Sequence, residues 1–234
     1  EIAQCLVGSE MCIRDRYIEA FVQKVAPAKT PVIVGKLIDM DASEDFIQSL
    51  LNSVMAMCPI APLVDVCEAR NRLRMIQPWL EARLKEGSQD PELHNAIGKI
   101  YISNNQNAQE FLLKDPFYDS KVIGQFCEKV DPFLAFLAYR RAKGACDEDL
   151  IRVTNENGLF KDQARYLVER MDDNLWKQVL TPDNEHKKEI VDQIVNTALP
   201  ECQNPEMVSR TVKAFMDADM PDALLDLLER LVLQ

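Results

Sequence analysis

The fold class follows from residues 119–144, which read DSKVIGQFCEKVDPFLAFLAYRRAKG. Apolar residues recur at helical spacing over Val122–Cys127, and a second apolar run extends from Asp131-Pro132 to Gly144. Aspartate before proline is typical of a helix start, because the carboxylate caps free backbone N–H groups and proline has none to satisfy. Glycine is typical of a helix end. This stretch therefore predicts two short helices joined by a few residues, a helix hairpin.

The same arrangement recurs along the chain. Asp90-Pro91 and Asn204-Pro205 repeat the helix-start pattern, and prolines 31 and 221 are placed in the same role. Hairpins are predicted to begin near five residues that lie 29, 27, 26 and 32 positions apart: Asp90, Asp119, Cys146, Asp172 and Asn204. A quasi-period near 30 built from helix hairpins indicates an α-solenoid, in which each hairpin buries its apolar face against its neighbours. The predicted fold class is all-α.

One proline interrupts this pattern. Pro78 lies inside the apolar stripe from Leu73 to Leu84, where a proline removes a hydrogen bond and clashes with the preceding turn. We expect it to kink that helix or to split it before Trp79.

Composition supports a helical protein and excludes some functions. The 234 residues include only 7 glycines and 12 prolines, too few turn residues for a hairpin-rich sheet protein. The net charge is −11. A chain this acidic lacks the positive field that neutralises phosphates, so we expect no nucleic-acid partner.

The longest uncharged stretch, Phe46–Val64, is not expected to span a membrane. It contains Gln48 and Asn52 and is broken by Pro59 and Pro62. A buried helix followed by a turn is the better interpretation. We expect neither a membrane span nor a signal peptide.

The cysteines do not form a recognisable site. There are seven, none at C-x-x-C spacing, and only His94 and His186 could complete a zinc site. Cys67 and His94 are the nearest candidate for a thiol nucleophile with a base, on weak evidence. We expect buried free thiols in a reducing compartment, and no metal or cofactor.

Other candidate residues have structural interpretations. His94 shares a helical face with Ile97 and Tyr101, which favours a packed histidine. The acidic clusters 147–149 and 172–173 lack the ligand pattern of a calcium loop and suit the first turn of a helix.

The remaining candidates are basic or aromatic. Arg70, Arg72 and Arg74, with Arg83 and Lys85 beyond, form one basic concentration that could meet an acidic partner surface, although a solvated helix face is favoured. Both tryptophans, Trp79 and Trp176, are expected in the core. No catalytic, cofactor-binding or metal residue is assigned.

Residues 1–16 stand apart from the rest. The string CLVGSEMCIRDR at 5–16 has no helical or strand period and resembles translated sequencing-adaptor DNA. We expect this segment to be non-native or disordered and exclude it from the fold prediction.

Long strings carry a resemblance to a known family: RNRL at 70–73, PWLEAR at 78–83, HNA at 94–96, KIYI at 99–102, NN at 104–105, DPFYDSKVIG at 115–124, CEK at 127–129, DP at 131–132, NENGLFK at 155–161, RYLV at 165–168, TVKAFM at 211–216 and AD at 218–219. Strings of this length are highly specific. Over residues 17–234 the sequence resembles the clathrin heavy-chain family, departing from it between Asn52 and Val66.

The resemblance implies a segment of the distal clathrin leg. Residues 17–174 would form most of one clathrin-type repeat and 175–234 the start of the next. Such legs are α-solenoid rods that interweave with other legs into a lattice on the cytoplasmic face of coated pits and vesicles. They serve endocytosis and intracellular transport at the plasma membrane and trans-Golgi, without a catalytic site or membrane insertion. Light chains and adaptors would bind regions outside this sequence, so no functional residue is carried over.

Two alternatives of other classes remain. Subunits of vesicle-tethering or vacuolar-sorting complexes also contain clathrin-type repeats, which would make the chain a binding scaffold. An enzyme built on a helical solenoid has only the free cysteines in its favour.

Overall fold

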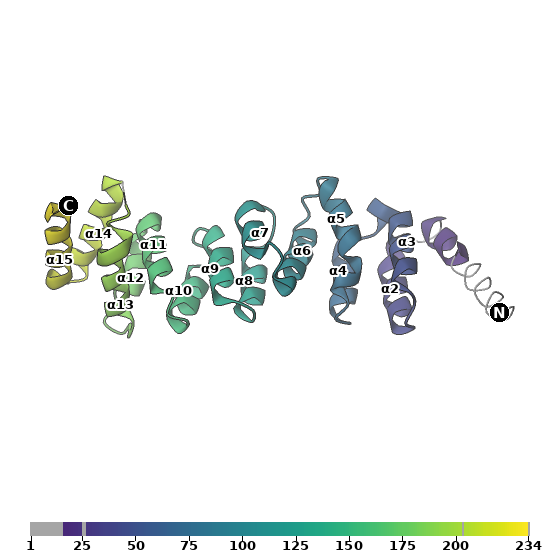
Figure 1. The fold of residues 1–234 in the computed structure, drawn as a ribbon, viewed down its shortest axis with the longest axis horizontal. Coiled ribbons are helices and arrows are strands. Elements are labelled where there is room, and N and C mark those ends of the chain that lie inside the picture. Colours follow the sequence, from purple (N-terminus) through teal and green to yellow (C-terminus); the bar gives the residue numbers. More distant parts are fainter. Residues whose placement is uncertain (1–15, 25–26, 203, 234) are drawn as a thin grey trace. The chain divides into compact units, whose positions relative to one another are not determined.

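The fold is entirely helical in the part of the chain that the computed structural model describes, residues 16–24, 27–202 and 204–233 (Figure 1). No strand occurs among these residues, and the all-α prediction is confirmed. The chain divides into two compact units, Glu1–Asp119 and Ser120–Gln234. The predicted boundary between repeats at residues 174 and 175 stays a prediction. Of the suspected non-native segment, residues 1–15 lie outside the described residues.

Unit 1 consists of successive helix pairs that stack on one another. The first helix of each pair packs against the first helix of the next, as α2 does on α4 and α4 on α6. Its helices are α2 (Thr30–Asp39), α3 (Glu44–Val54), α4 (Ile60–Glu68), α5 (Gln77–Lys85), α6 (Pro91–Asn104) and α7 (Ala108–Lys114), with short 3-10 turns η1 (Pro27–Lys29), η2 (Met55–Met57) and η3 (Leu73–Ile76). The starts of α2, α4 and α6 extend the period of about 30 residues into a region where the sequence did not reveal it.

Unit 2 continues the same design. Its helices are α8 (Ser120–Glu128), α9 (Pro132–Arg141), α10 (Asp147–Glu156), α11 (Phe160–Arg170), α12 (Asp173–Val179), α13 (Lys187–Gln193), the π-helical η4 (Ile194–Ala198), α14 (Pro205–Asp217) and α15 (Pro221–Leu233). All five predicted hairpin starts fall within one residue of an observed helix start.

The predicted helix starts are confirmed at atomic detail. Side-chain oxygens of Asp90, Asp131 and Asn204 accept the backbone N–H two residues further on, at 3.0, 2.8 and 2.9 Å. These bonds satisfy donors that have no partner within the helix. Pro78 occupies the first turn of α5 and separates it from η3, so the predicted split before Trp79 is confirmed.

The stretch 46–64 forms a buried helix and a turn, as expected. Helix α3 ends at Val54, η2 follows, and α4 begins at Ile60. Within the described residues, no helix combines the length and apolar character that crossing a bilayer requires. Both tryptophans are core residues, with Trp79 1% and Trp176 2% exposed.

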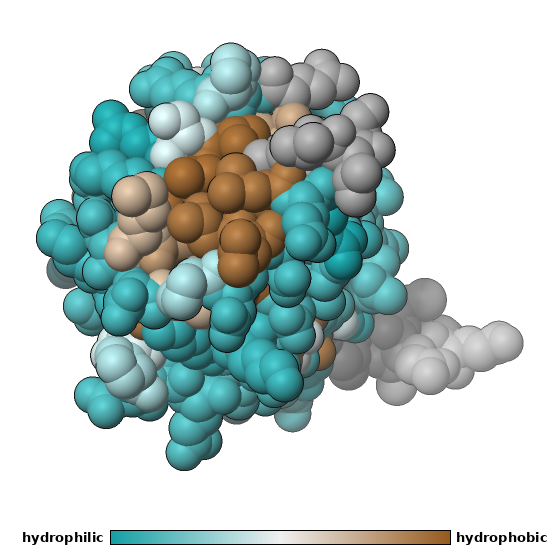
Figure 2. All heavy atoms as spheres, turned by 90° about the vertical axis from the view of Figure 1, so that its left-hand side faces the viewer, coloured by the Kyte–Doolittle hydropathy of each residue, from teal (hydrophilic) through white to brown (hydrophobic). Residues whose placement is uncertain are grey.

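Unit 2 also has an apolar patch on its surface. Figure 2 looks onto the end that carries α15 and shows apolar atoms surrounded by polar ones. Leu225 and Leu228 of α15 are 58% and 43% exposed. This patch is a surface where another chain could pack.

Candidate functional site

Helices α8 and α9 of unit 2 pack closely against each other. A methyl group added at Gly124 would lie 2.1 Å from Cε1 of Tyr139, closer than any real contact. Glycine is therefore what lets the buried tyrosine ring lie against the α8 backbone. Sequence reasoning missed this pair, although an isolated glycine inside a helical pattern often has a packing reason.

A carboxylate ties this joint to the next hairpin. Tyr139 donates its hydroxyl hydrogen to Glu128, and Arg152 of α10 donates to the same oxygen at 2.7 Å. Burial alone would raise the pKa of Glu128, but the hydrogen bonds from Arg152 and Tyr139 outweigh it and hold that pKa below 4.5. Burial and the adjacent Glu128 together raise the pKa of the tyrosine hydroxyl. Three helices, α8, α9 and α10, thus meet at one ionised carboxylate.

Ion pairs connect successive hairpins in both units. Each pair joins residues 24 to 40 positions apart, close to one repeat, at nitrogen–oxygen distances between 2.6 and 3.0 Å. The pairs are Asp39–Arg70, Glu68–Lys99, Glu128–Arg152, Arg140–Glu169, Arg165–Glu201 and Asp173–Lys213. Their partly exposed positions make each one individually weak, so they align neighbouring hairpins and leave most of the stability to the apolar core.

His94 is a packed structural residue, as predicted. Its Nδ1 lies 2.6 Å from Oδ2 of Asp115 and its Nε2 lies 2.9 Å from the carbonyl oxygen of Ser88. The neighbouring Asn95 accepts the backbone N–H of Asp119 at 2.8 Å. Helix α6 therefore holds both the loop before it and the loop that leads out of α7.

This arrangement does not pair the candidate thiol nucleophile Cys67 with His94 as its base. Both ring nitrogens of His94 are engaged by groups other than Cys67. Burial raises the pKa of Cys67 to about 11 and those of Cys58 and Cys127 to about 12. Since the thiolate is the nucleophile, a raised pKa lowers the reactivity of these three thiols near neutral pH. No group of three potential metal ligands is present among the described residues.

The acidic clusters lie in first helical turns, as predicted. Asp172 caps α12 by accepting the N–H groups of Asn174 and Leu175, and residues 147–149 open α10. Asp147 also accepts a hydrogen bond from Tyr166 of α11, a contact that sequence reasoning missed.

The basic concentration matches its prediction only in part: Arg72 and Arg74 are exposed and Arg83 and Lys85 lie on α5, but Arg70 and Arg72 lie between helices. We expected a solvated helix face, but α4 ends at Glu68 and the chain then turns, with Asn71 at a φ of 53°. Arg70 and Arg83 are held in ion pairs by Asp39 and Glu86. The asparagine side chain tolerates the left-handed conformation that ends the helix at this point.

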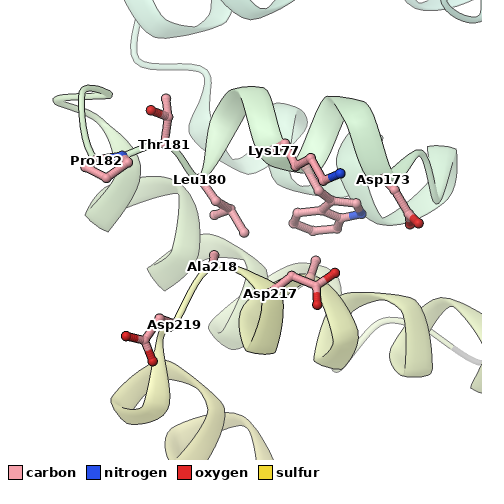
Figure 3. Close-up of a pocket in the computed structure, with 10 residues that line it drawn as sticks. Asp173, Lys177, Leu180, Thr181, Pro182, Asp217, Ala218 and Asp219 are labelled. Carbon is pink, nitrogen blue, oxygen red and sulfur yellow. The ribbon is translucent and has the colours of Figure 1, made fainter.

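Among the concave surfaces of unit 2 is one between α12 and the end of α14 (Figure 3). Its volume is about 410 Å³. Trp176 and Leu180 line it from the α12 side, and Ala214, Asp217 and Asp219 from the α14 side. An apolar floor with charged edges suits a side chain of a partner more than a reacting substrate.

Comparisons with known proteins agree on one family. A family model described as "Clathrin: Region in Clathrin and VPS" matches residues 51–191. The chain is 56% identical to the clathrin heavy chain of Dictyostelium discoideum and 57% to clathrin heavy chain 1 of Arabidopsis thaliana, each over 94% of its length. It is 50% identical over 93% of its length to clathrin heavy chain 2 of Homo sapiens. The chain spans only 13% of the length of each of these relatives.

Proposed function

Because the chain belongs to the clathrin heavy-chain family, we propose that it is a structural segment of a clathrin leg and contributes to the lattice of coated pits and vesicles. The observation that carries the proposal is the stack of hairpins, whose repeated ion pairs fix each hairpin against the next. In a stack of this kind each hairpin contacts only its neighbours, so packing and an extended surface are what it offers to a lattice.

The partners follow from the same proposal. Other clathrin legs are the partners of this segment, and light chains and adaptors bind elsewhere in the longer protein. The coat forms on the cytoplasmic face of the plasma membrane and trans-Golgi. We further propose that the chain is not an enzyme, a view supported by the raised pKa values of the buried thiols and by the engagement of both nitrogens of His94.

A chimera tests the structural role. In the Dictyostelium discoideum heavy chain, the matching segment is replaced by residues 17–234 of this chain. Coat formation by the purified chimera is measured by sedimentation and electron microscopy. We expect coats, because the hairpins of this segment pack on one another and are joined by ion pairs.

The matched control carries Gly124→Trp in the same chimera. An indole cannot fit at a position where even a methyl group would meet the Tyr139 ring, so this chimera is expected to form no coats. If the chimera that keeps Gly124 folds, as judged by circular dichroism, yet forms no coats, the proposal is overturned. Tight stoichiometric capture of a sorting-complex subunit, in place of coats, would favour the scaffold alternative.

A further inference from the structure

Two arginines in unit 1 have exposed side chains that form no ion pair within the described residues. Arg72 and Arg74 flank the half-buried Leu73 where the chain turns from α4 into η3, and we call these three residues the basic turn. Neither arginine forms an ion pair with any residue in the described ranges, unlike Arg70 nearby, which binds Asp39. The basic turn therefore presents two free guanidinium groups on either side of one apolar side chain.

Two aspartates in unit 2 are similarly unused. Asp217 ends α14 and Asp219 follows it in the turn before α15; both are exposed on the same edge of the groove, and in Figure 3 their carboxylates point apart on either side of Ala218. No ion pair holds either within the described part of the chain. The last turn of α14 contains no basic residue, so two carboxylates lie at the negative end of the helix dipole. This arrangement is unfavourable, and an added cation would relieve it.

The rest of the groove has an apolar floor and a second edge with different charges. Trp176, Leu180 and Ala214 form its floor. On the opposite edge Asp173 is already bound by Lys213 at 3.0 Å, while Lys177 is exposed (Figure 3). A cationic side chain is therefore attracted to the Asp217 edge only. We call the surface formed by Trp176, Leu180, Ala214, Asp217 and Asp219 the acidic groove.

We propose that the basic turn of one copy of this chain docks in the acidic groove of a second copy. Arg72 and Arg74 face Asp217 and Asp219, and Leu73 lies against the apolar floor. A convex turn with two positive charges matches a concave surface with two negative charges, which sets specificity and register. The contact is head-to-tail, because each copy keeps one free turn and one free groove. It rests on the proposed function, since a lattice requires copies to touch, and it assigns residues to that contact.

Net charge makes the proposal testable in an unusual way. Copies with a net charge of −11 repel one another, so making the chain less acidic should generally strengthen self-association. Asp217→Lys with Asp219→Lys moves the net charge from −11 to −7, yet the proposal requires weaker association. A matched control, Asp226→Lys with Glu229→Lys, makes the same change on exposed residues of α15.

The experiment measures self-association of the 234-residue chain by analytical ultracentrifugation up to about millimolar concentration, the range of a contact this small. The groove variant should associate roughly fivefold more weakly than the unmodified chain, because two exposed charge pairs become repulsive. The control should associate as strongly as the unmodified chain or more strongly. Far-ultraviolet circular dichroism checks that every variant is folded.

Mixing two variants gives the decisive measurement. The turn variant, Arg72→Glu with Arg74→Glu, should also associate weakly by itself. When it is mixed with the groove variant, opposite charges face each other at the turn and groove of both partners, so association should return to within about twofold of the unmodified chain.

Three outcomes would overturn the proposal. One is no self-association of the unmodified chain, and another is a groove variant that behaves like its control. The third is association that survives both reversals and is lost on Leu225→Glu, which would place the contact on the apolar patch of α15. Any of these, alongside a chimera that forms coats, would reject this contact and leave the proposed function standing.

Discussion

Substituting Gly124 by alanine tests the packing at the α8–α9 joint. The new methyl carbon would lie 2.1 Å from Cε1 of Tyr139 and 2.5 Å from Cδ1 and Cζ. The ring is 0% exposed and its hydroxyl is bonded to Glu128, so it has little freedom to move away. Forcing an extra methyl group into a packed core costs about 1–3 kcal/mol, and contacts this short favour the upper end.

Helix propensity acts in the opposite direction. Replacing glycine by alanine inside a helix stabilises it by about 1 kcal/mol. The net expectation for Gly124→Ala is a loss of about 2 kcal/mol in the free energy of unfolding, which lowers the Tm by roughly 4–8 °C for a chain of this length. In a Tyr139→Leu background the rigid ring is gone and a flexible side chain can move aside, so the same substitution should stabilise the protein by up to about 1 kcal/mol.

The assay is urea unfolding followed by far-ultraviolet circular dichroism, on the two single variants, the double variant and the unmodified chain. The sign of the Gly124→Ala effect should reverse between the two backgrounds, which a double-mutant cycle detects directly. Gly87→Ala is the control, because no atom lies within 4 Å of its added methyl group and only its positive φ causes strain. Its effect should be the same in both backgrounds. Equal effects of Gly124→Ala with and without the tyrosine would refute the packing argument.

Three further predictions concern capping, pH and thiol reactivity. Asp131→Ala should lower the free energy of unfolding by about 1 kcal/mol in urea denaturation through loss of the α9 cap, and Asp131→Asn should retain most of it. Because the folded pKa of Glu128 is lowered, its contribution to stability is complete above pH 4.5 and is lost as the pH falls through that folded value. The stability difference between the unmodified chain and Glu128→Gln, measured in urea from pH 7 to pH 3, should therefore shrink below pH 4.5, and a constant difference would contradict the assignment. Iodoacetamide at pH 8 should modify Cys202 before Cys127, since burial raises the pKa of Cys127 to about 12, and peptide mass spectrometry would show the order.

The sequence predicted the helix starts well because their signals are local. Asp90, Asp131 and Asn204 each cap a helix through a hydrogen bond to the residue two positions further on. An aspartate or asparagine followed by proline is therefore enough to predict the helix start. The period of about 30 residues was visible from residue 90 onward for the same reason. Before residue 90 fewer Asp-Pro or Asn-Pro pairs mark the starts, and the hairpins of α2 to α5 became evident only in the structure.

The inter-hairpin contacts could not be predicted because they join residues a whole repeat apart. Nothing in the local sequence distinguishes the half-buried Glu128, which binds Tyr139 and Arg152, from the exposed acidic residues of the chain. The basic concentration was misjudged for a related reason. Its helical interpretation depended on where α4 ends, and the left-handed turn at Asn71 decides that.

The ion pairs between successive hairpins also determine how the chain responds to mechanical load. Their carboxylates and ammonium or guanidinium groups are partly exposed, so each pair can separate into water at a cost of at most about 1 kcal/mol and then form again. The apolar contacts beneath them, such as the Tyr139 ring on Gly124, resist far more strongly. Under bending, a unit therefore opens a few surface pairs before any helix leaves its neighbours. Because salt screens these exposed pairs, it should lower the bending stiffness of a unit without unfolding the protein.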